Sequence, residues 1–457
     1  MNYLSAKRLS LRICLCIAVF LSVTGCRREQ KESHLQPPGD VVTQTTLLAT
    51  IGDQEKPNSV DYAAGNKAVF NIVFNERGRG VAYIAEIAGK LHVVHNGTIG
   101  RPYQAIANLR TNPDGQRVAY SASVNGKRCQ VTDGREGQLF DDTGVPVFSP
   151  DGRHVAYKVI MGGKIHIAVD NELSDGYRAY GGNPVFSADS AKVAYVEGAE
   201  ENRKTRLIVS DLAFKKKMVK ESCGSLMVTN RDKTRIAAIN DINNKQRVIV
   251  FGFDQPDAVQ EGPLYDSIEF PAFGKDGDAV AYIAKKGTAR VLVLNGQERP
   301  LPEGDLIEAP VVHPDREKAG IIMAIKHRYF LQEPFSHNEP KEKQYDEAAE
   351  LVYNRDGSRH AYTARNGKNW FLVVNGKEGP AFDRVITPMF SPDGSRLIYR
   401  ARKDGKRFVV TADANGVVLR QHPNYEMVFP PVFTADGKSV AYGVKDGQQL
   451  IWKVENL

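Results

Sequence analysis

The stretch FSPDGRHVAY, residues 148–157, decides the fold because the chain repeats it from end to end. A second clear copy is FSPDGSRLIY at residues 390–399. Self-similarity at a fixed period of about 40 residues is the signature of a repeat architecture. The residue in the aspartate position marks ten copies, 37 to 44 residues apart: Arg77, Asp114, Asp151, Asp189, Asp232, Asp276, Asp315, Asp356, Asp393 and Asp436.

Each copy predicts four short antiparallel strands. The first strand ends just before the Asp-Gly pair, which forms a tight turn because glycine accepts positive φ and the carboxylate bonds nearby amides. The Val-Ala-Tyr group lies in the second strand. Dipeptides such as Asn366-Gly367 and Asp404-Gly405 then favour a two-residue hairpin into a third strand, with a short fourth strand after it.

These units require neighbours on both sides. Runs such as residues 370–374, WFLVV, are apolar on both faces, and a four-stranded unit of about 40 residues cannot bury two faces alone. We therefore predict an all-β fold, a β-propeller of about ten four-stranded repeats over residues 45–457. A single large ring and two tandem smaller propellers both remain open. A single ring needs residues 45–62 to supply a strand for the last blade after residues 451–454, whereas two rings place a seam near residues 335–347.

The motif also carries a family resemblance. Phe-Ser-Pro-Asp-Gly followed by Val-Ala-Tyr resembles the WD-like propeller repeat of TolB and related envelope proteins, over roughly residues 60 to 457. The resemblance implies the fold more than a function, since that family includes scaffolds, binders and non-catalytic domains of peptidases. The copies at Arg77, Asp189, Asp232 and Asp315 depart from the full motif.

The first residues predict export and lipidation. Lys7, Arg8 and Arg12 precede an apolar run at residues 13–23, which is typical of a signal peptide and too short to span a bilayer. Residues 23–26, VTGC, resemble the lipobox of bacterial lipoproteins. We therefore expect residues 1–25 to be a lipoprotein signal peptide and Cys26 to be lipidated, although an ordinary secretory cleavage site before a cysteine is the alternative.

The next segment, residues 26–44, is polar, contains Pro37-Pro38-Gly39 and is interpreted as a flexible tether. Arg27 stands where lipoproteins retained in the inner membrane often carry aspartate. The sequence thus favours the outer membrane, facing the periplasm.

The charge pattern bears on the class of partner, and the cysteines bear on disulfide formation. The formal charge of +7 falls to +4 without the three basic residues of the signal segment, and the bases are scattered among nearly as many acids. This pattern argues against a nucleic-acid partner, which would favour a basic patch. Cys129 and Cys223 lie in different repeats, so we expect two buried free thiols, although export permits a disulfide.

No catalytic, cofactor or metal motif is found. The sequence lacks a nucleophile elbow, a His-Glu-x-x-His motif, a phosphate loop and a dinucleotide fingerprint. We interpret the repeated aspartates as turn caps rather than calcium ligands, and the repeated tyrosines as packing residues. The histidines scatter over many repeats and are interpreted as core or surface residues: His92, His95, His154, His166, His313, His327, His337, His360 and His422.

Two functions follow from this sequence. The first is a membrane-anchored envelope lipoprotein whose propeller is a non-catalytic scaffold or binding module for a protein, peptide or glycan. The alternative is a propeller enzyme, a glycan lyase or hydrolase, whose site is assembled from several blades at the mouth of the channel.

Overall fold

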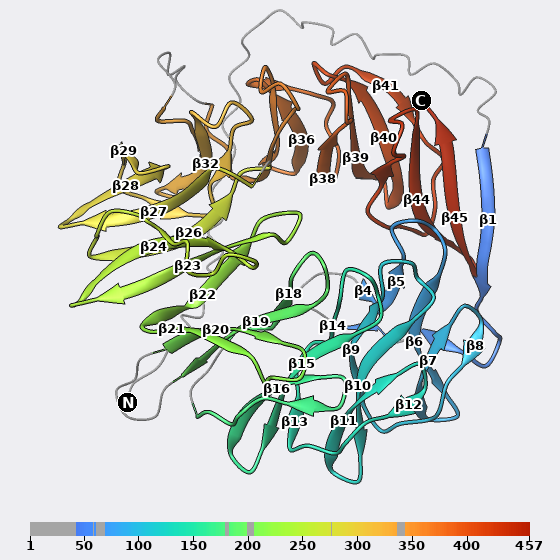
Figure 1. Ribbon diagram of the computed structural model, residues 1–457. Helices are drawn as coiled ribbons and strands as arrows, with labels where there is room; N and C mark the ends of the chain where they lie inside the picture. The colour runs from blue at the N-terminus through green and yellow to red at the C-terminus, as the bar shows by residue number, and fades with distance from the viewer. Residues whose placement is uncertain are drawn as a thin grey trace, which may run out of the picture. The chain divides into compact units, whose positions relative to one another are not determined.

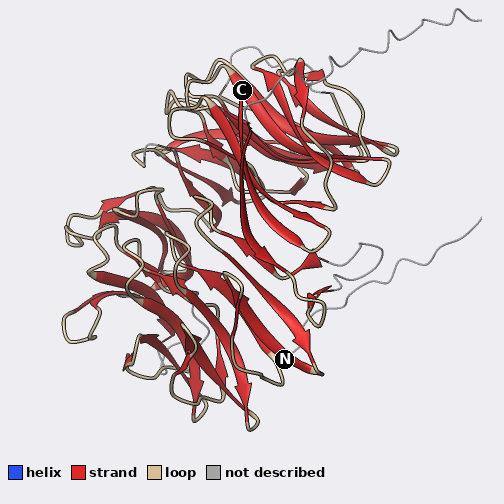
Figure 2. Ribbon diagram, turned by 90° about the vertical axis from the view of Figure 1, so that its right-hand side faces the viewer, coloured by secondary structure: helices blue, strands red, loops and turns tan. Residues whose placement is uncertain are grey.

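The computed structural model describes residues 43–57, 59–60, 69–178, 182–198, 205–275, 277–335 and 343–457. All of these belong to one compact unit, residues 36–457. The described residues form β-strands joined by turns, with no helix among them (Figure 2). Consequently, no described segment is a helix long and apolar enough to cross a membrane.

Ten antiparallel sheets, the blades, follow one another along the chain (Figure 1). The first three have these strands. Blade 1 contains β2 (Lys56–Pro57), β5 (Ile72–Phe74), β6 (Val81–Ile87), β7 (Lys90–His95) and β8 (Thr98–Ile99). Blade 2 contains β9 (Ile106–Thr111), β10 (Val118–Val124), β11 (Lys127–Thr132) and β12 (Arg135–Glu136). Blade 3 contains β13 (Asp142–Thr143), β14 (Val147–Phe148), β15 (Val155–Met161), β16 (Lys164–Val169) and β17 (Glu172–Leu173). A separate pair, β3 (Ser59–Val60) and β4 (Val69–Phe70), lies outside the blades.

The next three blades each contain four strands. Blade 4 contains β18 (Val185–Phe186), β19 (Lys192–Gly198), β20 (Thr205–Asp211) and β21 (Lys217–Lys220). Blade 5 contains β22 (Cys223–Thr229), β23 (Arg235–Ile242), β24 (Lys245–Gly252) and β25 (Gln260–Glu261). Blade 6 contains β26 (Ser267–Phe273), β27 (Val280–Lys286), β28 (Ala289–Leu294) and β29 (Gln297–Leu301).

The last four blades complete the series. Blade 7 contains β30 (Asp305–Leu306), β31 (Val311–Val312), β32 (Ala319–Ile325) and β33 (Arg328–Gln332). Blade 8 contains β34 (Glu347–Tyr353), β35 (His360–Asn366), β36 (Asn369–Val374) and β37 (Lys377–Glu378). Blade 9 contains β38 (Arg384–Phe390), β39 (Arg396–Lys403), β40 (Lys406–Asp413) and β41 (Val418–Gln421). Blade 10 contains β42 (Met427–Val428), β43 (Val432–Phe433), β44 (Ser439–Asp446), β45 (Gln449–Asn456) and β1 (Thr43–Thr50).

The turn between the first two strands is capped as the sequence predicts. In blade 3, Asp151 Oδ1 accepts hydrogen bonds from the Ser149 hydroxyl at 2.5 Å and from the Arg153 amide at 3.0 Å. Gly152 follows at φ +74°, a conformation that costs glycine little. The same bond to the amide two residues on, at 2.9 to 3.1 Å, recurs at Asp114, Asp189, Asp315, Asp356, Asp393 and Asp436.

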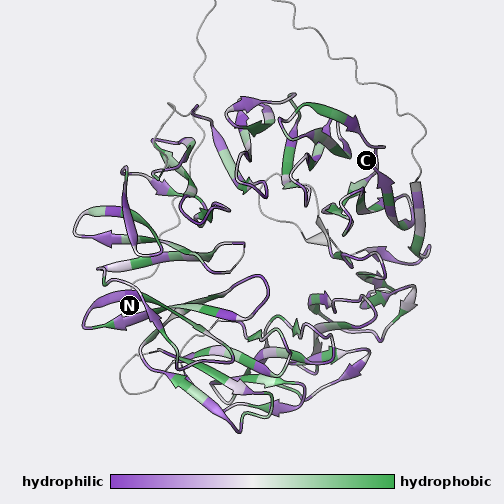
Figure 3. Cartoon of the chain, turned by 45° about the horizontal axis from the view of Figure 1, so that its top comes forward, coloured by the Kyte–Doolittle hydropathy of each residue, from purple (hydrophilic) through white to green (hydrophobic). Residues whose placement is uncertain are grey.

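The core lies between the blades. Hydrophobic stretches run along the two middle strands of each blade, and the turns are mostly hydrophilic (Figure 3). The buried apolar side chains of the described residues group into ten clusters, and each cluster joins two neighbouring blades. Burial on both faces explains why the strands lack a polar face.

One of these clusters joins the last blade to the first and so closes a single ring. It joins Ala49 and Leu450 of blade 10 to Val81 and Tyr83 of blade 1. The first described strand, β1, pairs antiparallel with the last, β45, so both belong to the closing blade (Figure 1). Another cluster packs blade 7 onto blade 8 across the place where two rings would have a seam. The two-ring alternative is therefore wrong.

The closing strand is shorter than the range expected from the sequence. Only residues 43–50 of β1 pair with β45. Lys56 and Pro57 of β2 instead pair with Glu86 and Ala85 of β6, in the first blade. The segment predicted as one strand thus contributes β1 to the last blade and β2 to the first.

Candidate functional site

An aromatic residue stands at the same place in most connections between blades. It lies in the connection to the next blade and pairs back, through an isolated bridge, with the second residue of the strand that follows the Val-Ala-Tyr strand, as Tyr103 does with Leu91. We call it the linker aromatic. Its seven copies among the described residues are Tyr103, Phe140, Tyr177, Tyr265, Tyr345, Phe382 and Tyr425.

Four of the seven linker aromatics form ring pairs with the Val-Ala-Tyr tyrosine of the next blade. Tyr103 meets Tyr120 with ring centroids 6.1 Å apart, and Tyr265 meets Tyr282 at the same distance, both edge to face. The pairs Tyr345 with Tyr362 and Phe382 with Tyr399 repeat this geometry at 6.1 and 6.2 Å. The repeated tyrosines are therefore packing residues, as the sequence predicts, but their aromatic partners were not predicted.

The junction of blades 6 and 7 lacks both rings. Arg290 is the second residue of β28 and pairs with Leu301, so Leu301 holds the position of the linker aromatic. In β32, Ile321 holds the position of the tyrosine. Both aliphatic side chains are buried, at 9% and 0% exposure, in the cluster that joins these two blades.

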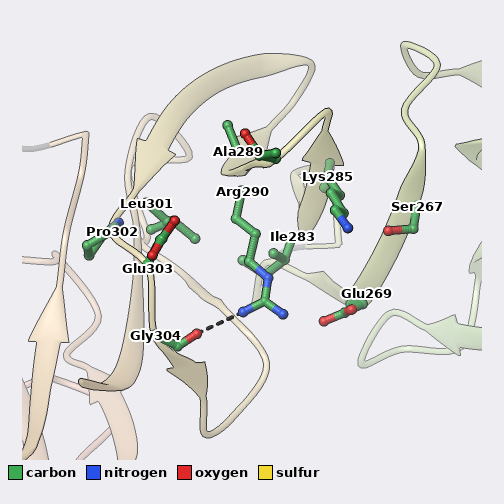
Figure 4. Close-up of a pocket in the computed structure, with 12 residues that line it drawn as sticks. Ser267, Glu269, Ile283, Lys285, Ala289, Arg290, Leu301, Pro302, Glu303 and Gly304 are labelled. Atoms are coloured by element: carbon green, nitrogen blue, oxygen red, sulfur yellow. Dashed lines mark hydrogen bonds between the residues drawn. The ribbon is translucent and has the colours of Figure 1, made fainter. Parts of the chain in front are cut away.

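A cavity of about 600 Å³ opens at this junction, at the end of blade 6 that carries the β27–β28 hairpin. This volume lies within the usual range of ligand pockets. Leu301 and Pro302 form one wall, and Ser267 and Lys285 lie on the other side (Figure 4). The remaining lining residues are Glu269, Ile283, Ala284, Thr288, Ala289, Arg290, Glu303 and Gly304.

Arg290 extends into the middle of the cavity (Figure 4). One terminal nitrogen of its guanidinium donates a hydrogen bond of 2.8 Å to the Gly304 carbonyl, which fixes the plane of the group. The other terminal nitrogen points toward Glu269 (Figure 4). A Cβ on Gly304 would lie 2.6 Å from the Ala324 carbonyl oxygen, so only glycine lets this connection approach blade 7 so closely.

The cavity lining combines charged groups with an apolar surface. Its lining contains two cations, Lys285 and Arg290, two carboxylates, Glu269 and Glu303, and an apolar surface between them. Neither histidine nor cysteine is among the lining residues. Mixed charges around an apolar surface can orient a polar ligand while burying an apolar part of it.

One arrangement elsewhere has the order of a hydrolytic triad. Thr411 Oγ1 lies 2.7 Å from His422 Nε2, and His422 Nδ1 lies 2.5 Å from Glu455 Oε2. The Tyr442 hydroxyl donates to the other Glu455 oxygen at 2.7 Å. Thr411, His422 and Glu455 are each 2% exposed, and the cavity beside Thr411 measures only about 60 Å³. A substrate cannot reach this threonine, and the bonds instead satisfy polar groups between blades 9 and 10.

Four of the other described histidines have local contacts within or beside their blades. The rings of His92 and His166 each bond the backbone carbonyl of the residue just after the neighbouring strand, Gly100 after β8 and Ser174 after β17, at 2.9 Å. His154 pairs with Asp170 at 2.8 Å. Burial lowers the pKa of His360, whose ring stacks on Tyr362. In the part of the chain that the structure describes, no three His, Cys, Asp or Glu residues cluster as metal ligands would.

Cys129 and Cys223 are free and buried, in different junctions between blades. Burial raises the pKa of each thiol to about 11. This agrees with the prediction of two buried free thiols. Cys26, the predicted lipidation site, lies outside the described residues, as do His337 and Asp276.

The fold defines the chain as a ten-bladed β-propeller closed by its N-terminal strand. No family model matches it, and no curated protein does either. It is similar to a solved structure described as a eukaryotic initiation factor, with 12% identity, a TM-score of 0.45 and coverage of 76% of this chain and 96% of that one. It is also similar to the β-propeller domain of the Trilobed protease from Pyrococcus furiosus, which is described as having an open velcro topology. There the identity is 12%, the TM-score 0.33 and the coverage 60% of this chain and 95% of that one. These scores are too low to carry an argument about function.

Proposed function

We propose that this protein is a lipid-anchored propeller of the bacterial cell envelope, similar in kind to TolB, that binds a protein, peptide or glycan without transforming it. The observation that carries the binding role is the cavity between blades 6 and 7, with its fixed guanidinium and its mixed charges. A propeller is a rigid frame on which such a pocket keeps its shape, because each blade is packed on both faces.

The anchor is proposed from the sequence. Residues 23–26 match a lipobox, and acyl chains on Cys26 would hold the protein at a membrane, since two or more chains anchor stably where one does not. The polar residues 26–44 would then act as a tether between the membrane and β1. We place the protein at the outer membrane, facing the periplasm, on the strength of Arg27.

Cross-linking in intact cells tests this proposal. The tagged full-length protein and its Cys26→Ala variant are cross-linked, purified and compared by mass spectrometry, with an unrelated lipoprotein as control. We expect a reproducible envelope partner with the wild type and loss of both membrane fractionation and the partner with Cys26→Ala. A wild-type protein found in the soluble fraction, or one with no partner beyond the control, would refute the proposal.

A further inference from the structure

The cavity lies where the repeat elsewhere places an aromatic ring. Register identifies the position, because Arg290 pairs with Leu301 as Leu91 pairs with Tyr103 and Trp370 with Phe382. Seven connections carry a ring there, and this one carries a leucine. The Val-Ala-Tyr position opposite is also aliphatic at this junction, which removes a second ring. The junction of blades 4 and 5 also lacks both rings, with Ala238 in the Val-Ala-Tyr position, and there Phe251 and Phe253 are buried in the cluster that joins the blades. At the junction of blades 6 and 7, Leu301 lines the cavity, and its smaller side chain leaves part of the space of a linker ring open.

The open space also contains a partner for a ring. Arg290 is fixed by its bond to Gly304, so its guanidinium presents a preorganised flat face inside the cavity. The chain already uses this interaction at the equivalent end of the junction between blades 8 and 9, where the Arg384 guanidinium lies 3.8 Å from the Trp370 ring centroid. Arginine faces attract aromatic rings through cation–π contacts.

We propose that this pocket binds an aromatic side chain, tyrosine foremost, presented by a peptide segment of a partner protein. The inserted ring would lie in the cavity, against Leu301 and beside Arg290. Tyrosine is preferred because linker tyrosines elsewhere donate their hydroxyl to a glutamate, Tyr103 to Glu136 and Tyr265 to Glu298, both at 3.0 Å.

Two features of the pocket favour a peptide over a glycan. No aromatic side chain lines the cavity, so it offers a sugar no face on which to stack. The charged residues Lys285, Glu269 and Glu303 stand around the apolar surface, where they can pair with the polar backbone and charged neighbours of an inserted side chain. The inference deepens the proposed function, since it names the ligand class of the same site.

The test compares defined probes on the full-length protein in detergent. Titration calorimetry measures Ala-Tyr-Ala, Ala-Leu-Ala and N,N′-diacetylchitobiose against the wild type and three variants. Leu301→Tyr restores the ring of the repeat and fills the pocket. Leu419→Tyr is the matched control, because it adds the same ring at a leucine that is 50% exposed on β41, in another blade. Arg290→Met keeps the length of the side chain but removes the guanidinium.

We expect the wild type and Leu419→Tyr to bind Ala-Tyr-Ala at least tenfold more tightly than the other probes. Leu301→Tyr should lose this preference, and Arg290→Met should weaken it by about 2- to 30-fold, as the strength of cation–π contacts implies. Arg290→Met also tests the site if Leu301→Tyr does not fold. Equal binding of the two peptides, tighter binding of the disaccharide, or unchanged binding by both pocket variants would overturn the inference.

Cross-linking with Leu301→Tyr separates this inference from the proposed function. If the variant captures the same partner as the wild type, the partner binds elsewhere, so the pocket inference fails while the binding role stands. If the wild type binds Ala-Tyr-Ala selectively but captures no partner in cells, the pocket inference stands and the envelope role fails.

Discussion

Closure of the ring depends on one glycine. Gly443 lies in β44, and a Cβ built on it would stand 2.5 Å from Cγ of Phe74, which reaches across from blade 1. The Phe74 ring has little room to move, because its centroid is 4.7 Å from that of Phe429 and 6.4 Å from that of Trp452. We therefore expect Gly443→Ala to weaken the contact between blades 10 and 1.

The magnitude follows from the distances. Carbon atoms prefer separations of about 3.5 to 4.0 Å, so the ring must shift by about 1 Å into its neighbours. Overpacking of this kind costs roughly 1 to 3 kcal/mol. The loss of glycine flexibility in the unfolded chain returns about 0.4 to 1 kcal/mol. Subtracting these ranges gives a net loss in the free energy of unfolding of about 0 to 2.6 kcal/mol, centred on about 1.3 kcal/mol.

Urea unfolding followed by tryptophan fluorescence measures this loss, since Trp452 lies in the closure itself. Hydrogen exchange should show faster exchange in β1 and β45, with β23 unchanged. Gly252→Ala is the matched control, because its Cβ would have no neighbour closer than 3.7 Å and its φ is not positive. Equal stability of Gly443→Ala and wild type, or equal losses in both variants, would refute this account of the closure.

Three further predictions concern the turn caps, the thiols and the buried histidine. Hydrogen bonds, of which that from the Ser391 hydroxyl has the largest effect, lower the pKa of Asp393 to about 2. The stability that this turn cap contributes is therefore fully present above pH about 4 and is lost as the pH falls through about 2. The difference in urea midpoint between wild type and Asp393→Ala should therefore shrink over that range, and a constant difference would contradict it. Cys129 and Cys223 should resist Ellman's reagent at pH 8 until the protein is denatured, because their pKa values are raised to about 11; rapid labelling of the folded protein would show that they are accessible. Glu455→Leu should lower the free energy of unfolding by about 1 to 3 kcal/mol, because it leaves the buried His422 ring and Tyr442 hydroxyl without their acceptor. Adding His422→Leu should recover part of the loss, and no recovery in the double variant would argue against a coupled pair.

The strands and the turn caps could be predicted because each repeat encodes them locally. The Asp-Gly turn needs only a carboxylate two residues before an amide, and the sequence shows this directly. The number of rings could not be predicted in this way. It depends on which blade packs against blade 1, and no local pattern contains the cluster that brings Leu450 and Tyr83 together. Likewise, alternation cannot tell that residues 43–50 join the last blade and residues 56–57 the first.

The linker aromatics were predictable but were missed. Tyr103, Phe140 and Tyr177 recur at intervals of 37 residues, as regular as the turn itself. An alignment on the Asp-Gly turn alone does not examine this position. The candidate site is harder still to find from the sequence, because its only signal is that Leu301 stands where other connections have an aromatic residue.

A repeat protein can acquire a binding site where its sequence departs from the repeat. Not every such departure leaves open space for a ligand. His422 stands where other blades have Gly100, Gly137, Gly262 or Gly379, as the shared backbone bond to the third strand shows. Its ring fills the space, and Thr411 and Glu455 bond both of its nitrogens, so the site is saturated. Leu301 differs from the repeat in the opposite direction. Its side chain is smaller than the ring found in other connections, so atoms of the cavity wall lack contacts on one side. Contacts that the protein does not make itself remain available to a ligand, and for this reason the junction of blades 6 and 7, rather than the triad-like group, is the place to look for a partner.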